Sequence, residues 1–77
     1  MRDRARKVSL AKKVGLKILR DLHRKNQSID SFALEVGMAR STLREIVAGR
    51  SNPRLRTVEA IAEGLGYPSL SQFFSEF

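Results

Sequence analysis

The twenty residues Ile29–Ala48, IDSFALEVGMARSTLREIVA, decide the fold of this chain. Apolar side chains stand at the fourth, eighth, tenth, fifteenth and eighteenth of these positions, where they would fill the inside of a corner between two helices: Phe32, Val36, Met38, Leu43 and Ile46. The small Ala33 would let a second helix approach closely, and Gly37 would reverse the chain without a Cβ clash. The stretch therefore predicts two helices joined by a tight turn at a steep angle.

The second of these helices, expected at about residues 40–48, keeps hydrogen-bonding side chains on its outer face. They are Arg40, Ser41, Arg44 and Glu45. An exposed helix face of this composition is what a protein presents to the major groove of DNA.

Apolar spacing outside this stretch predicts three further helices. The first starts at about residue 11, the fourth covers about residues 55–65, and a short fifth follows Ser69. Ser28 is a candidate N-cap for the second helix, and Gly49–Pro53 is a loop. No segment of four or more residues alternates with period two, so strands are not expected. We expect an all-α domain of five helices over residues 10–77, preceded by a basic flexible arm over residues 1–9.

The 77 residues allow one small domain, and the absence of cysteine excludes disulfides and a Cys-based zinc site. The formal charge of +7 indicates a polyanionic partner. Residues 1–25 carry +8, residues 26–56 carry +2 and residues 57–77 carry −3. Lys17, Arg20 and Arg24 give the first helix a charged face, which either is solvated or meets that partner. No apolar run approaches the ~20 residues that span a bilayer.

Residues from about 14 to 74 resemble the lambda-repressor/Cro-type helix-turn-helix family, also called the XRE family. Residues 37–46, GMARSTLREI, are similar to the family's GVSRSTISRI, and GRSNP at 49–53 is similar to its GKSNP. The resemblance implies a compact five-helix, lambda-repressor-like domain. It also implies a cytoplasmic, nucleoid-associated transcriptional regulator that binds double-stranded DNA. The implied protein is repressor-like and acts as a homodimer on a palindromic operator, with its recognition helix in the major groove.

The resemblance also implies contact residues, position by position. Those expected to touch base edges are Ala39, Arg40, Ser41, Arg44 and Glu45. Those expected at the phosphate backbone are Thr42, Arg50, Ser51, Asn52, Arg54 and Arg56. The last two arginines stand at the predicted start of the fourth helix, where the dipole disfavours a cation by roughly 0.3–1 kcal/mol. This placement favours a phosphate there, the alternative being that both side chains extend into water.

The sequence departs from the family pattern at three positions. Ile29 replaces the usual Gln, Ala39 replaces a capping Ser or Thr, and Arg54 replaces a small cap. Base reading is therefore expected either to be weaker or to depend more on Arg40 and Arg44.

The Phe-rich end, which contains Phe73, Phe74 and Phe77, can serve the core or a partner. Consecutive phenylalanines point about 100° apart on a helix, so Phe74 and Phe77 are expected to cover a second subunit. The lone His23 and the absence of a catalytic constellation favour a non-enzyme without cofactor, metal or evident small-molecule ligand.

Two alternatives to the sequence-specific regulator remain open. One is an antitoxin-like or adaptor module that binds a protein through the Phe-rich end and has weak DNA specificity. The other is non-specific binding through the basic arm, with Arg2–Lys7, Lys12 and Lys13 as the main contacts.

Overall fold

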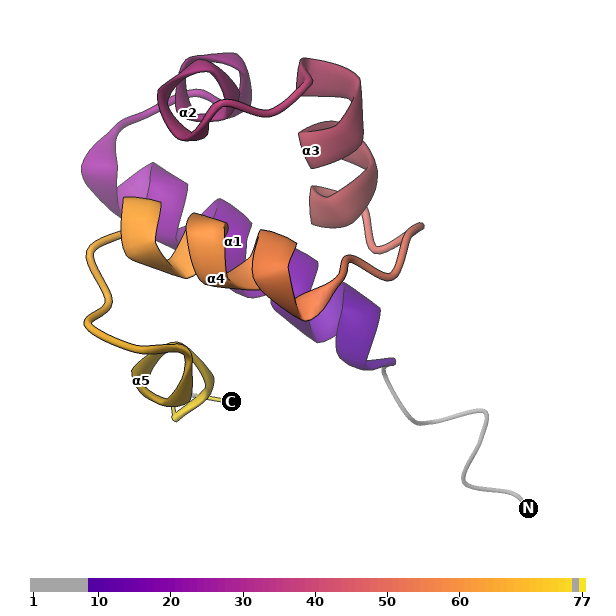
Figure 1. Cartoon of the computed structure of the whole chain (residues 1–77). Helices are drawn as coiled ribbons and strands as arrows, with labels where there is room; N and C mark the ends of the chain where they lie inside the picture. Colours follow the sequence, from indigo (N-terminus) through magenta and orange to yellow (C-terminus); the bar gives the residue numbers. More distant parts are fainter. Residues whose placement is uncertain (1–8, 76) are drawn as a thin grey trace.

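The computed structural model describes residues 9–75 and 77, which form five helices and no strand (Figure 1). The helices are α1 (Leu10–Lys25), α2 (Ile29–Val36), α3 (Arg40–Val47), α4 (Leu55–Gly64) and α5 (Leu70–Phe74). The predicted all-α class with five helices is confirmed. The predicted basic arm lies outside the described residues except for Ser9, which is the N-cap of α1.

Serine side chains begin three of the helices. Ser9, Ser28 and Ser69 each accept a hydrogen bond from the backbone N–H three residues later, at 3.2, 3.0 and 3.2 Å. Each such cap contributes about 1 kcal/mol, because it satisfies a donor that has no partner within the helix. Ser28 is the cap that the sequence predicted. Ser9 sets the start of α1 one residue before the predicted position.

All five helices contribute to one apolar core. Its buried members are Val14, Ile18, Leu22, Phe32, Ala33, Leu43, Ile46, Val58, Ile61, Ala62 and Phe73. The helix α3 packs on α1 and α2, while α4 packs on α2 and α5. In Figure 1, α2 and α3 therefore lie at one end of the molecule and α5 lies at the other. Each fully buried large side chain contributes about 1.5–3 kcal/mol.

The crossing of α1 and α3 depends on Gly15, a buried glycine within α1. A Cβ added there would clash with the carbonyl oxygen of Val47 and would lie 2.7 Å from that of Ile46. Only a residue without a side chain lets the end of α3 come this close. Gly15 therefore helps to set where α3 sits on the domain.

The charged face of α1 differs from the expectation at one position. Arg20 and Arg24 are exposed, whereas Lys17 is buried and is neither solvated nor open to a polyanion. Its Nζ donates to the Tyr67 hydroxyl at 2.7 Å and to Asp21 Oδ2 at 3.4 Å. It also lies 4.7 Å from the centroid of the Tyr67 ring. The expectation was wrong because Tyr67, fifty residues later in the chain, covers this face, while Asp21 supplies the countercharge.

Candidate nucleic-acid interface

The predicted turn between two helices is present at Gly37. This residue ends α2 in the left-handed conformation, with φ of 74°. The next backbone N–H, from Met38, donates to the Ala33 carbonyl at 2.9 Å and closes the turn. Ala33 is fully buried, as expected of a small residue at a close helix crossing. The stretch therefore forms a helix-turn-helix, in which α3 is the second helix.

The helix α3 has one buried side and one exposed side. Leu43 and Ile46 are buried in the core. All four side chains predicted to face outward are exposed: Arg40, Ser41, Arg44 and Glu45. Ala39 and Thr42, also expected at the DNA, are exposed as well. Ala39 is the N-cap of α3 and makes no side-chain cap hydrogen bond, which agrees with its expected weakness as a cap.

Both exposed arginines, Arg40 and Arg44, face a carboxylate on α2. Nη2 of Arg44 donates to both oxygens of Asp30, at 2.8 and 2.9 Å. Arg40 also pairs with this carboxylate, with 3.8 Å between its Nη1 and Asp30 Oδ2. Asp30 is in the first turn of α2, where the helix dipole favours an anion. The sequence pattern did not single out Asp30, since its pairing depends on how α2 and α3 cross.

A second ion pair joins the end of α3 to the loop that follows. Nε and Nη2 of Arg50 donate to the two carboxylate oxygens of Glu45, at 3.1 and 3.0 Å. The hydrogen bond from Arg50 lowers the pKa of Glu45. At neutral pH this carboxylate is ionised, so it can accept hydrogen bonds but cannot donate them. The same contact raises the pKa of Arg50. The structure therefore brings together one expected base contact and one expected phosphate contact.

The remaining expected phosphate contacts lie on the loop after α3 and at the start of α4. Ser51 is half-buried, whereas Asn52, Arg54 and Arg56 are exposed. Arg54 is the N-cap of α4 without a side-chain cap hydrogen bond, and Arg56 lies in the first turn, which contains no acidic residue. This is the position at which the sequence placed the two arginines. Two cations therefore stand at the positive end of a helix dipole, where they are electrostatically disfavoured in the absence of an anion.

The three phenylalanines of the Phe-rich end differ in exposure. Phe73 is fully buried, Phe74 is half-buried, and Phe77 is 47% exposed. The Phe74 and Phe77 rings pack edge to face with their centroids 4.9 Å apart. Phe74 also lines an apolar groove with Leu10, which is 62% exposed, at the start of α1. The same groove is also lined by Asn52 and Pro53, which belong to the loop after α3.

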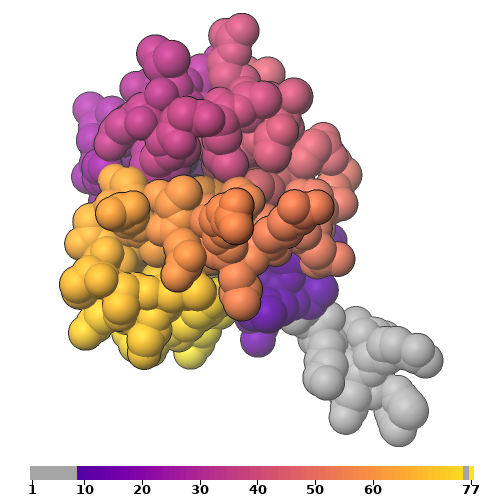
Figure 2. Space-filling view, in the orientation of Figure 1, coloured from indigo at the N-terminus to yellow at the C-terminus, as the bar shows by residue number. Residues whose placement is uncertain are grey.

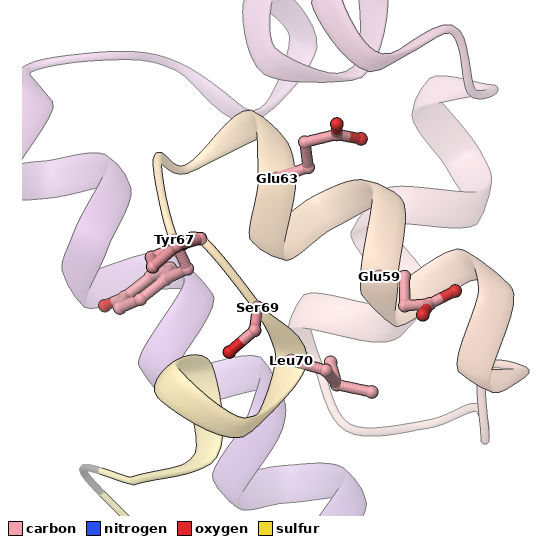
Figure 3. Close-up of a pocket in the computed structure, with 6 residues that line it drawn as sticks. Glu59, Glu63, Tyr67, Ser69 and Leu70 are labelled. Atoms are coloured by element: carbon pink, nitrogen blue, oxygen red, sulfur yellow. The ribbon is translucent and has the colours of Figure 1, made fainter.

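Figure 2 shows α4 and α5, in orange and yellow, side by side on one face of the molecule. Glu59 and Glu63 of α4, with Tyr67, Ser69 and Leu70, line an open hollow of about 300 Å³ there. Figure 3 shows both carboxylates on the outer side of α4 and the Tyr67 ring directed towards α1. An acidic surface repels phosphate, so this hollow does not belong to a nucleic-acid interface.

Two other features, a metal site and a membrane-spanning helix, are not found in the part of the chain that the structure describes. That part holds no group of three or more His, Cys, Asp or Glu side chains that could bind a metal ion. Within the same residues, no helix combines the length and apolar character needed to cross a membrane.

Comparison with known proteins supports the family suggested by the residues. A family model for the helix-turn-helix, HTH_3, matches residues 16–70. Neither the curated proteins nor the solved structures yield a match. The matched region runs from α1 into α5. It includes the helix-turn-helix and the loop after α3, at which phosphate contacts are expected. The chain therefore belongs to the lambda-repressor/Cro-type (XRE) helix-turn-helix family and is a DNA-binding regulator, of a family that is generally non-enzymatic.

Proposed function

We propose that this protein is a repressor-like regulator that acts as a homodimer on a palindromic operator, with α3 in the major groove. The observation that carries the proposal is the exposed polar face of α3, which projects from a helix anchored by Leu43 and Ile46. A rigid anchor matters because base reading requires donors and acceptors at fixed positions. Occupying promoter DNA is enough for such a protein to repress.

Arg40 and Arg44 are the strongest candidates for base contacts. Their side chains are 70% and 59% exposed. Each guanidinium can pair with guanine O6 and N7, a contact worth about 1–3 kcal/mol of discrimination. The exposed carboxylate of Glu45 can accept from cytosine N4. Ala39 and Ser41, exposed at the start of the helix, complete the proposed base-reading set.

The proposed phosphate contacts surround this face. They are Thr42, Arg50, Ser51, Asn52, Arg54 and Arg56. The arginines at the start of α4 support this role, because a phosphate there would interact with two cations and with the positive end of the helix. Such contacts set the position of the protein on DNA without reading its sequence.

The proposed homodimer uses Phe74 and Phe77. The exposed part of Phe77 and the groove beside Phe74 offer apolar area that association with a second subunit would remove from water. Two recognition helices related by a two-fold axis then require half-sites about 34 Å apart, one turn of DNA. The same surface would suit the rival function, a module that binds another protein and DNA only loosely.

Selection of bound sequences from random duplex DNA tests the proposal. A palindromic consensus with half-sites about 10 base pairs apart is expected. A selection that enriches no sequence would contradict the proposal and favour the protein-binding module. A solution mass in the presence of the selected duplex, showing one or two chains per operator, tests the dimer separately.

A further inference from the structure

Asp30 belongs neither to the apolar core nor to the expected phosphate contacts. It is a half-buried carboxylate on α2 that faces the exposed side of α3. It lies between Arg40 and Arg44, the two proposed base-reading arginines. We propose that Asp30 is a specificity-determining residue, which restrains these arginines so that they engage DNA fully only at the cognate sequence. The inference rests on the proposed function, since it concerns the same face of α3.

The geometry of the Arg44 guanidinium carries the first step. A guanidinium offers its donors in two forks, one formed by Nη1 and Nη2 and the other by Nε and Nη2. Nη2 is common to both forks, and it is the nitrogen that donates to both oxygens of Asp30. A two-bond contact between Arg44 and a guanine must therefore displace Asp30 or share Nη2 with it. While Asp30 is paired, at least one N–H of Nη2 is occupied, so the two forks are not both free for DNA.

The second step compares what cognate and non-cognate DNA can offer Arg44 in place of Asp30. A guanine presents O6 and N7 at the spacing of one fork, so it can replace both hydrogen bonds lost with Asp30. The other bases cannot do this, because adenine and thymine each present one acceptor in the major groove and cytosine presents a donor. The exchange is therefore more favourable at a cognate base than at non-cognate DNA.

The charge of the cluster acts in the same direction. Arg40, Asp30 and Arg44 together carry a formal charge of +1, where the arginines alone would carry +2. Sequence-independent binding grows with the number of cations that meet phosphates, so the carboxylate weakens that component. The side chains of Asp30 and Arg44 are 40% and 59% exposed, so the pair can open without leaving a buried charge behind.

The chain offers a matched control on the same helix. Glu35 also lies on α2 and is exposed, but its carboxylate accepts a hydrogen bond from Gln27 at 2.8 Å. Its replacement by Gln removes the same charge from α2 and leaves the cluster around Asp30 intact. Any effect of Asp30→Asn beyond that of Glu35→Gln therefore reports on the arginines of α3.

The test is a titration of the full chain with two labelled duplexes, the selected operator and a scrambled duplex of equal composition, at several salt concentrations. Asp30→Asn should bind the scrambled duplex about three- to tenfold more tightly, because one more cation becomes available to phosphate. It should gain less on the operator, so the ratio of the two affinities falls. Glu35→Gln should leave this ratio within about twofold of wild type, since it acts as a general change of charge.

The role of Arg44 is tested by combining substitutions. In an Arg44→Ala background, Asp30→Asn should lose most of its effect on the ratio, because its partner is absent. Thermal unfolding of each variant establishes that it is folded under the conditions of the titration. An unchanged or increased ratio in Asp30→Asn, or an equal fall in Glu35→Gln, would overturn the inference.

The outcomes also separate this inference from the proposed function. If wild type binds both duplexes equally, sequence-specific recognition is wrong and the inference falls with it. If wild type discriminates while Asp30→Asn keeps the same ratio, recognition stands and only the role of Asp30 is contradicted.

Discussion

Replacing Gly15 by Ala tests whether the position of α3 depends on its close approach to α1. The new Cβ would collide with the carbonyl oxygens of Val47 and Ile46. Both are backbone atoms in the last turn of α3, so no change of side-chain rotamer can relieve the collision. Helix propensity alone would favour Ala over Gly by about 1 kcal/mol. Forcing extra volume into a packed crossing costs about 1–3 kcal/mol, and an approach this close to backbone belongs at the upper end.

The expected net result of Gly15→Ala is therefore a loss of about 2 kcal/mol in the free energy of unfolding. For a domain of this size that lowers Tm by roughly 8–16 °C, which thermal unfolding followed by circular dichroism would detect. Gly64→Ala is the matched control, because a Cβ there would meet side-chain atoms of Val36 and Phe32 and no backbone atom of a neighbouring helix. It should cost less than Gly15→Ala. A Tm for Gly15→Ala equal to or above that of wild type would refute the argument that this crossing requires glycine.

Three further predictions concern the caps, the buried polar cluster and the phosphate contacts. Ala39→Ser should raise the free energy of unfolding by about 1 kcal/mol, because the backbone at this N-cap is extended and a serine there would accept a hydrogen bond from the first turn of α3. Chemical unfolding measures this, and an unchanged free energy of unfolding would contradict the prediction. Burial raises the pKa of Tyr67 above its unfolded value of 10.0, so the folded state holds this proton more tightly. The contribution of Tyr67 to stability should thus be full below about pH 10 and be lost as the pH rises further. Tyr67→Phe should show a smaller fall in stability above about pH 10, and identical pH profiles would contradict this assignment. Arg56→Ala should weaken binding to operator and scrambled DNA alike and lower the salt slope by about one, while an effect confined to the operator would mean that Arg56 reads bases.

The helix-turn-helix could be predicted from sequence because its determinants are local. Ala33 and Gly37 act through their own size and backbone freedom, and Ser28 caps the helix that begins at the next residue. The apolar spacing around them also separates the core side of α3 from its exposed side. The outward set on α3 and the position of Arg54 at the start of α4 followed from the same local rules.

What could not be predicted depends on contacts between distant segments. The close approach at Gly15 requires knowledge of how α1 crosses α3. The burial of Lys17 depends on Tyr67, which lies fifty residues away in the chain. The pairing of Asp30 with Arg44 joins two helices across the turn, and neither residue carries a local signal of it. These tertiary contacts therefore add the features that sequence spacing leaves out.

The measurement that most directly tests the central claim is the ratio of operator to scrambled-duplex affinity in Arg44→Ala. Arg20→Ala serves as the control, because it removes an exposed arginine from α1 and leaves α3 unchanged. If α3 reads bases, Arg44→Ala should reduce the ratio by about 5- to 150-fold, equivalent to roughly 1–3 kcal/mol, while Arg20→Ala keeps it. An unchanged ratio in Arg44→Ala, together with loss of all binding on deletion of residues 2–8, would contradict sequence recognition by the helix-turn-helix.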